Sequence, residues 1–190
     1  MSDALAEAVL ALDRRGFLRL ATVCAALGYV GCRGSALPAS LAPPVDLELR
    51  VFSLRAYATF QAAAMRLLGA RGEEAIRARR VDPAAAADAW VARLPGLGAT
   101  LAQALWVLEF GVYPLVAKWR PFTALDAREQ DLVLEDLMQS RWDTKRDLFK
   151  GLKSLAMLAY YADPASRAAI GHPGPFDRQG IALAMQYDPS

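Results

Sequence analysis

The residue types that most often carry out chemistry are scarce in this chain of 190 residues. Its single histidine is His172, and its two cysteines are Cys24 and Cys32. A histidine-rich metal site is therefore excluded, and no cysteine-bound cluster can form after Cys32. A Ser-His-Asp triad would have to use His172 from within a Pro- and Gly-rich string, and no GxSxG elbow occurs.

Loops that cradle phosphates are also absent from the sequence. It contains neither GxGxxG nor GxxxxGK[ST], the glycine patterns of dinucleotide- and nucleotide-binding folds. With 22 basic and 20 acidic residues, the net charge of +2 gives no support for a nucleic-acid partner. We therefore expect a chain with no catalytic set, no metal and no cofactor of its own, which is not an enzyme by itself.

One acidic residue, Glu109, lies inside an apolar run, Trp106-Val-Leu-Glu-Phe-Gly. It is interpreted either as a functional buried acid, such as an ion-path residue, or as a structural carboxylate. In the second case it pairs with an arginine or lies at a helix surface. We favour the structural interpretation, because buried acids usually have partners. An acid near the middle of residues 97–117, followed by Pro114, also argues against a membrane-spanning helix there.

The N-terminal segment has the anatomy of an export signal. Arg14 and Arg15 are followed, after one glycine, by Phe17 and Leu18, and then by the uncharged apolar stretch 20–31. A bilayer-spanning helix needs roughly 20 apolar residues, so this stretch is too short to be a stable anchor. The pattern predicts a twin-arginine signal over residues 1–32 and a periplasmic protein.

Cys32 closes the apolar stretch in Tyr29-Val-Gly-Cys, which is similar to a lipoprotein processing box. A lipid on Cys32 would place the protein on a membrane surface without a spanning helix. The alternative is an incidental cysteine with cleavage further on, after Ala36. Residues 33–52, which include the Pro-rich string 35–44, are expected to be a linker.

Helical periodicity dominates the rest of the chain, and no alternating strand pattern is present. The expected fold is all-α, an irregular bundle of five or six short helices over residues 53–176, followed by a C-terminal tail, 177–190. Start signals are Ser53, Asp82-Pro83, the capping-box spacing of Asp126 and Glu129, Asp143, and Asp163-Pro164.

The string Ile170-Gly-His-Pro-Gly-Pro175 combines two glycines and two prolines. Such a segment has little conformational freedom to lose, which lowers the entropic cost of binding a partner. We predict a docking or lid role for it, with a surface turn after a C-cap glycine as the alternative.

Two regions together resemble the gluconate 2-dehydrogenase subunit 3 family, and also the helical segment that precedes the flavin domain in some long-chain alcohol oxidases. The first region is the signal from Arg14 to Cys32. The second is a series of anchors between residues 94 and 175: Leu94-Pro95, Leu105 to Glu109, Phe122 to Leu125, Arg128, Leu134, Ser140-Arg141, Leu155, Tyr160-Tyr161 and Ile170 to Pro175. Members usually carry tyrosine where this chain has His172.

The resemblance implies a small accessory subunit that accompanies a large FAD-containing flavoprotein of the glucose–methanol–choline (GMC) oxidoreductase family. The small subunit supplies the export signal, the folded pair crosses the membrane together, and a c-type cytochrome subunit often accepts the electrons. By this analogy the partner-interface residues are Tyr160, Tyr161, Gly171, His172, Pro173, Gly174 and Pro175. The alternative from the residues alone is a stand-alone exported or lipid-anchored helical binding protein.

Overall fold

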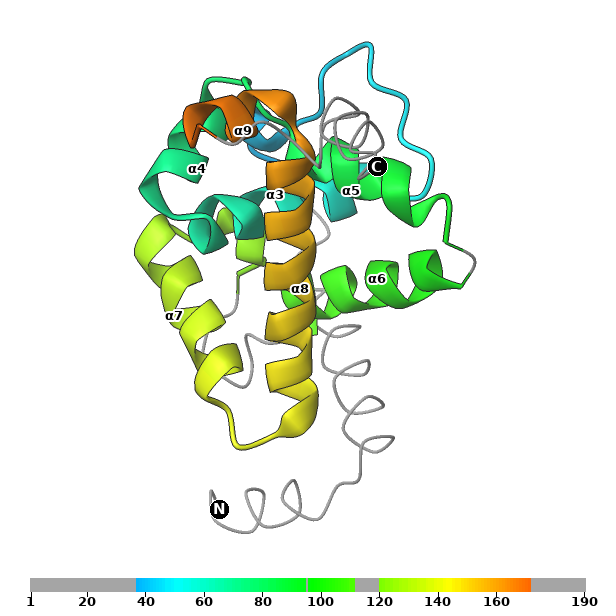
Figure 1. Ribbon diagram of the computed structural model, residues 1–190. Coiled ribbons are helices and arrows are strands. Elements are labelled where there is room, and N and C mark those ends of the chain that lie inside the picture. The colour runs from blue at the N-terminus through cyan, green and yellow to red at the C-terminus, as the bar shows by residue number, and fades with distance from the viewer. Residues whose placement is uncertain (1–36, 95, 112–119, 172–190) are drawn as a thin grey trace, which may run out of the picture.

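The computed structural model describes residues 37–94, 96–111 and 120–171 of the chain. Within these ranges it contains helices and no strand, which confirms the all-α irregular bundle (Figure 1). The signal residues Arg14, Arg15, Phe17, Leu18 and Cys32, the string 172–175 and the tail 177–190 lie outside the described residues.

Seven α-helices occur in the described part of the chain, slightly more than expected. They are α3 (Leu54–Leu67), α4 (Gly69–Arg77), α5 (Pro83–Val91), α6 (Leu97–Trp106), α7 (Ala127–Gln139), α8 (Asp143–Ala162) and α9 (Pro164–Ala169). Three shorter segments complete the set: the 3₁₀ turns η1 (Ala39–Leu41) and η4 (Phe122–Ala124), and the π-helical η2 (Val107–Gly111).

Four of the predicted start signals cap helices as expected. Ser53 accepts from the Ala56 N–H, and Asp82 accepts from the Ala85 N–H ahead of a proline at the first turn. Asp126 forms a reciprocal capping box with Glu129, and Asp163 accepts from the Ala165 N–H. Each bond satisfies a backbone donor that the first helical turn leaves without a partner.

The expected cap at Asp143 is wrong. Trp142 is the residue before α8, its side chain makes no capping bond, and Asp143 is the first helical residue. The Asp143 carboxylate instead pairs with Arg146 one turn further on. An acid in the first turn still interacts favourably with the helix dipole, so α8 begins at the predicted place by a different means.

The core surrounds α3, which contacts α4, α5, α6, α7 and α8. Its middle, from Tyr57 to Met65, is buried and rich in alanine, so neighbouring helices can approach closely. The long helix α8 lies against α3, α5 and α7, and α9 packs on the end of α8 (Figure 1). Tyr57, Phe60, Phe122 and Leu105 are among the largest fully buried side chains.

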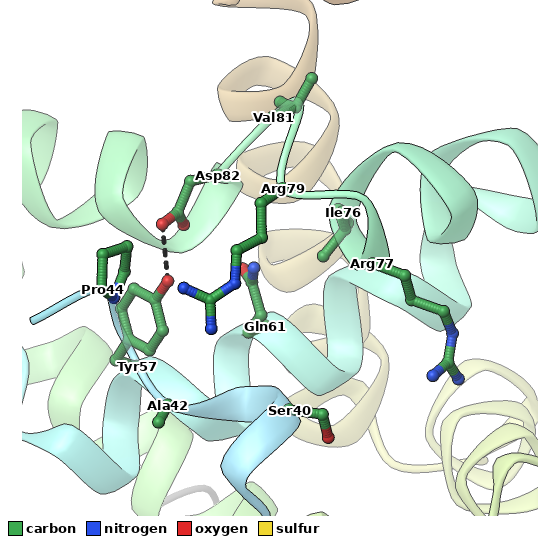
Figure 2. Close-up of a pocket in the computed structure, with 10 residues that line it drawn as sticks. All are labelled: Ser40, Ala42, Pro44, Tyr57, Gln61, Ile76, Arg77, Arg79, Val81 and Asp82. Carbon is green, nitrogen blue, oxygen red and sulfur yellow. Dashed lines mark hydrogen bonds between the residues drawn. The ribbon is translucent and has the colours of Figure 1, made fainter.

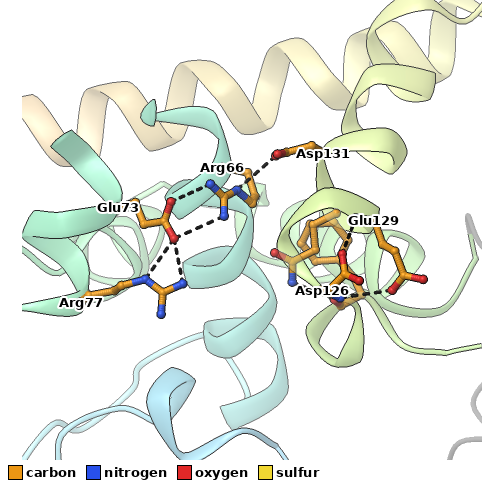
Figure 3. A network of polar contacts seen from close by, with 8 residues as sticks. Arg66, Glu73, Arg77, Asp126, Glu129 and Asp131 are labelled. Atoms are coloured by element: carbon orange, nitrogen blue, oxygen red, sulfur yellow. Dashed lines mark hydrogen bonds and ion pairs between the residues drawn. The ribbon is translucent and has the colours of Figure 1, made fainter. Parts of the chain in front are cut away.

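An ion-pair network joins three helices at the edge of this core (Figure 3). Arg66 of α3 pairs with Glu73 of α4 at 2.6 Å and with Asp131 of α7 at 3.1 Å. Glu73 also pairs with Arg77 at 2.7 Å. The hydrogen bond from Arg77 is the main cause that lowers the pKa of Glu73, although partial burial opposes it.

The described part of the predicted linker, residues 37–52, lies against the bundle. Leu41 and Phe52 are buried in the core. Asp88 of α5 is only 3% exposed and accepts three successive backbone N–H groups, from Arg50 at 2.7 Å, Val51 at 2.9 Å and Phe52 at 2.7 Å. One carboxylate thus fixes the segment that leads into α3.

Candidate functional site

The predicted interface residues that the structure describes occupy two environments at the end of α8. The Tyr160 ring is 8% exposed and packs in a small cluster with Ala75 and Val81, whereas Tyr161 is 40% exposed. The two rings meet edge to face at 5.1 Å between centroids. Burial raises the pKa of the Tyr160 hydroxyl. Tyr161 is therefore the one of the pair that a partner chain can reach directly.

Apolar side chains are exposed around Tyr161. On α8, Tyr161 lies one helical turn after Met157 and Leu158, which are adjacent in sequence. Of these residues, Leu158 is 59% exposed. Ile170, after the end of α9, is also exposed. Gly171 follows with a φ of +68°, a left-handed conformation that glycine adopts without strain. The three exposed residues of α8, Met157, Leu158 and Tyr161, are here called the α8 patch; in the sequence they are followed by Ile170 and the predicted docking string.

A second candidate is the buried acid Glu109 in η2. It is 1% exposed, and four groups lie within hydrogen-bonding distance of its two carboxylate oxygens. Arg55 Nη1 at 2.9 Å and Thr123 Oγ1 at 2.7 Å donate to Oε1, while Thr59 Oγ1 and the Thr123 N–H, both at 3.1 Å, reach Oε2. Glu109 thus has the arginine partner that the structural interpretation of this acid predicts.

The proton positions around Glu109 are limited by Thr59. Its Oγ1 lies 2.8 Å from the Arg55 carbonyl oxygen and 3.1 Å from Glu109 Oε2. A hydroxyl has one proton, so it donates to only one of these oxygens at a time. When the Thr59 hydroxyl donates to the Arg55 carbonyl, the Thr59 oxygen faces Glu109 Oε2 as an acceptor. This arrangement suits a Glu109 carboxyl that is protonated. Burial also favours the protonated form, because it raises the pKa of Glu109. The hydrogen bonds from Thr123 and Arg55 lower this pKa but have smaller effects.

The third candidate is a cavity of about 100 Å³ between η1, α3 and the loop after α4 (Figure 2). Tyr57, Gln61, Arg79 and Asp82 line it. The Tyr57 hydroxyl donates to Asp82 Oδ2 at 2.6 Å, while Asp82 Oδ1 accepts from the Ala85 N–H at 2.9 Å. Burial first, and then the bond to Asp82, raise the pKa of Tyr57, so the phenol stays protonated at neutral pH.

Sequence reasoning did not identify this cavity or the role of Asp88. A lone acid among the alanines of Pro83-Ala-Ala-Ala-Ala-Asp88 is a signal that could have indicated a buried acceptor. No comparable signal marks the cavity, because its lining residues come from three separate segments. Its location depends on how η1 folds back over α3.

The described residues contain no cluster of three or more metal-ligating side chains. None of the helices in the described ranges is long and apolar enough to cross a membrane. No protein-family model, curated protein or solved structure matches the chain. The functional argument therefore depends on the residues themselves.

Proposed function

We propose that this protein is the non-catalytic small subunit of a periplasmic, FAD-dependent oxidoreductase of the GMC family. It would carry the twin-arginine signal for both chains, escort the large flavoprotein subunit through export and stabilise it afterwards. A c-type cytochrome subunit is a further partner under this proposal, and a membrane surface is another if Cys32 is lipidated. FAD would be bound by the large subunit.

The observation that carries the proposal is the exposed α8 patch, which precedes the predicted docking string in the sequence. Leu158 and Tyr161 expose apolar area near the end of the described chain, and Tyr161 is one of the residues for which the family resemblance implies a contact with the flavoprotein. Exposed apolar residues that lie together are typical of protein interfaces. Aromatic rings such as that of Tyr161 are enriched in the most strongly binding positions of interfaces.

A pull-down of a C-terminally tagged chain from its native host tests the proposal. We expect a stoichiometric large partner, together with the visible absorption bands of an oxidised flavin. A colourless, well-folded chain recovered alone, from cells in which it is expressed at its natural level, would contradict the proposal.

The alternative is a stand-alone exported or lipid-anchored helical binding protein. The observation that favours it is the cavity lined by Tyr57, Gln61, Arg79 and Asp82, which provides an internal site in the small chain. The same pull-down separates the two functions, because a stand-alone protein would be recovered without flavin and without a stoichiometric partner.

A further inference from the structure

Arg79 occupies a backbone position that normally belongs to glycine. It is the only non-glycine residue with a positive φ, +53°, among the residues that the structure describes. Helix α4 ends there in a Schellman motif: the Arg80 N–H donates to the Ala75 carbonyl, and the Arg79 N–H donates to the Ile76 carbonyl. Any residue with a Cβ is strained at this position, and such strain commonly occurs at functional sites.

Arg77 and Arg79 both line the cavity, but the Arg79 side chain extends toward Tyr57 and Gln61, whereas the Arg77 side chain points to the opposite side (Figure 2). Arg77 is paired with Glu73 at 2.7 Å, and Arg80 is paired with Glu74 at 3.0 Å. Within the described ranges, no carboxylate forms an ion pair with Arg79. Of these three arginines, the one in the strained position is therefore the one whose charge is available to a ligand.

The acceptors of the cavity wall are already occupied by groups of the protein. Both oxygens of Asp82 accept hydrogen bonds, one from Tyr57 and one from the Ala85 N–H. Gln61 Oε1 accepts from the Ala84 N–H at 3.3 Å, and no acceptor for Gln61 Nε2 occurs in the described part of the chain. The lining side chains that remain for a ligand are the Arg79 guanidinium and the Gln61 amide NH₂, which are donors, and the Ser40 hydroxyl, which can also donate.

We propose that this cavity binds an oxyanion, a carboxylate or phosphate group, through the guanidinium of Arg79 and the side-chain amide of Gln61. A planar guanidinium matches the two oxygens of such a group with parallel hydrogen bonds. A cavity of about 150 Å³ accommodates benzene, so about 100 Å³ is enough to admit an anionic head group but not to enclose a flavin or a dinucleotide. This inference does not rest on the proposed function.

Arg79→Gly is a well-matched test variant, because glycine suits the backbone conformation while removing the guanidinium. The purified full-length protein, with any co-purifying partner, is heated in the presence of sodium phosphate or sodium acetate, against sodium chloride of equal ionic strength. We expect at least one oxyanion to raise the melting temperature of the wild type. We expect Arg79→Gly to unfold at a higher temperature than the wild type without oxyanion, and to lose the oxyanion response.

Two further variants make the result specific. Arg79→Lys keeps the positive charge but loses the planar guanidinium with its two parallel donors, so this variant should bind the oxyanion at least tenfold more weakly. Arg80→Ala removes a neighbouring exposed arginine that does not line the cavity, so its response should equal that of the wild type. An unchanged response in Arg79→Gly would overturn the proposal.

The oxyanion could be free in solution or part of a lipid head group, so a second arm measures co-sedimentation with phosphatidylglycerol vesicles against phosphatidylcholine vesicles. If Arg79 is needed for vesicle binding and neither phosphate nor acetate changes the melting temperature, the ligand is a lipid phosphate. If phosphate or acetate raises the melting temperature, the ligand is a soluble anion. If the wild type responds in neither arm, the proposal is wrong.

Discussion

Thr123 contacts Glu109 through both its side chain and its backbone. The hydroxyl donates to Oε1 at 2.7 Å, and the backbone N–H donates to Oε2 at 3.1 Å. Arg55 and Thr59 approach the same carboxylate from α3. The acid therefore joins η2 and η4 to the central helix, and because η2 departs from α-helical geometry, this junction is the least regular part of the core.

Replacing Glu109 by glutamine should destabilise the bundle. Glutamine keeps the shape but replaces one acceptor oxygen by an NH₂ group, which faces the donors of Thr123, Thr59 or Arg55. Each mismatched buried donor costs about 1–3 kcal/mol, and we expect a total loss in this range. Urea unfolding followed by circular dichroism measures it. An unchanged unfolding free energy would show that water replaces the lost contacts.

The stability difference between wild type and Glu109→Gln should depend on pH. Burial raises the pKa of Glu109 above its ordinary value of 4.5. A raised folded-state pKa contributes stability that is fully present below the unfolded value and is lost as pH rises through the folded value. The advantage of the wild type should thus be full below pH 4.5 and decrease as the pH rises from there through the folded-state pKa. An advantage that grows with pH would mean that Arg55 outweighs burial.

Removing the Asp88 carboxylate should loosen residues 50–52. Asp88→Ala leaves three backbone N–H groups without their acceptor, one of them buried, at a cost of about 2–4 kcal/mol. Limited proteolysis should then cut between residues 46 and 52 faster than in the wild type. Asp147→Ala is the control, because Asp147 is exposed and its only ion pair within the described residues is the long one to Lys150, at 3.9 Å. Equal cutting of Asp88→Ala and the control would contradict the role of Asp88.

Leu158→Ser tests the α8 patch. Because Leu158 is 59% exposed, the substitution should change the stability of the free chain by no more than about 0.5 kcal/mol. It should nevertheless reduce recovery of the large subunit in the pull-down. Leu132→Ser on α7 is a matched control, since Leu132 is also exposed but lies on another helix. Equal recovery with both variants would remove the α8 patch from the interface.

Replacing Arg14 and Arg15 by lysines tests the export signal. The double variant should leave the small subunit in the cytoplasm and the large subunit with it, if the pair crosses the membrane as a folded complex. Fractionation of cells, with immunodetection of both chains, measures this. Appearance of the double variant in the periplasm would contradict the twin-arginine interpretation.

Local signals predicted the fold well, because capping depends on residues close in sequence. Asp126 and Glu129 form their box within one helical turn, and Asp82 acts on the helix that follows it. The partner of Glu109 could not be predicted, since Arg55 lies 54 positions away. Arg79 was also missed, because glycine is the usual sequence marker of a left-handed position and this chain has arginine there.

The packing of residues 37–52 against the bundle also limits the distance between Cys32 and the core. Leu41 is buried, and eight residues lie between it and Cys32, so the two are nine residue steps apart. Since an extended chain covers at most about 3.3–3.6 Å per residue, Leu41 can lie no more than about 32 Å from Cys32. A lipid on Cys32 would therefore act as a short tether that keeps η1 near the bilayer. A bound oxidoreductase would then be held close to the membrane and to any electron acceptor within it.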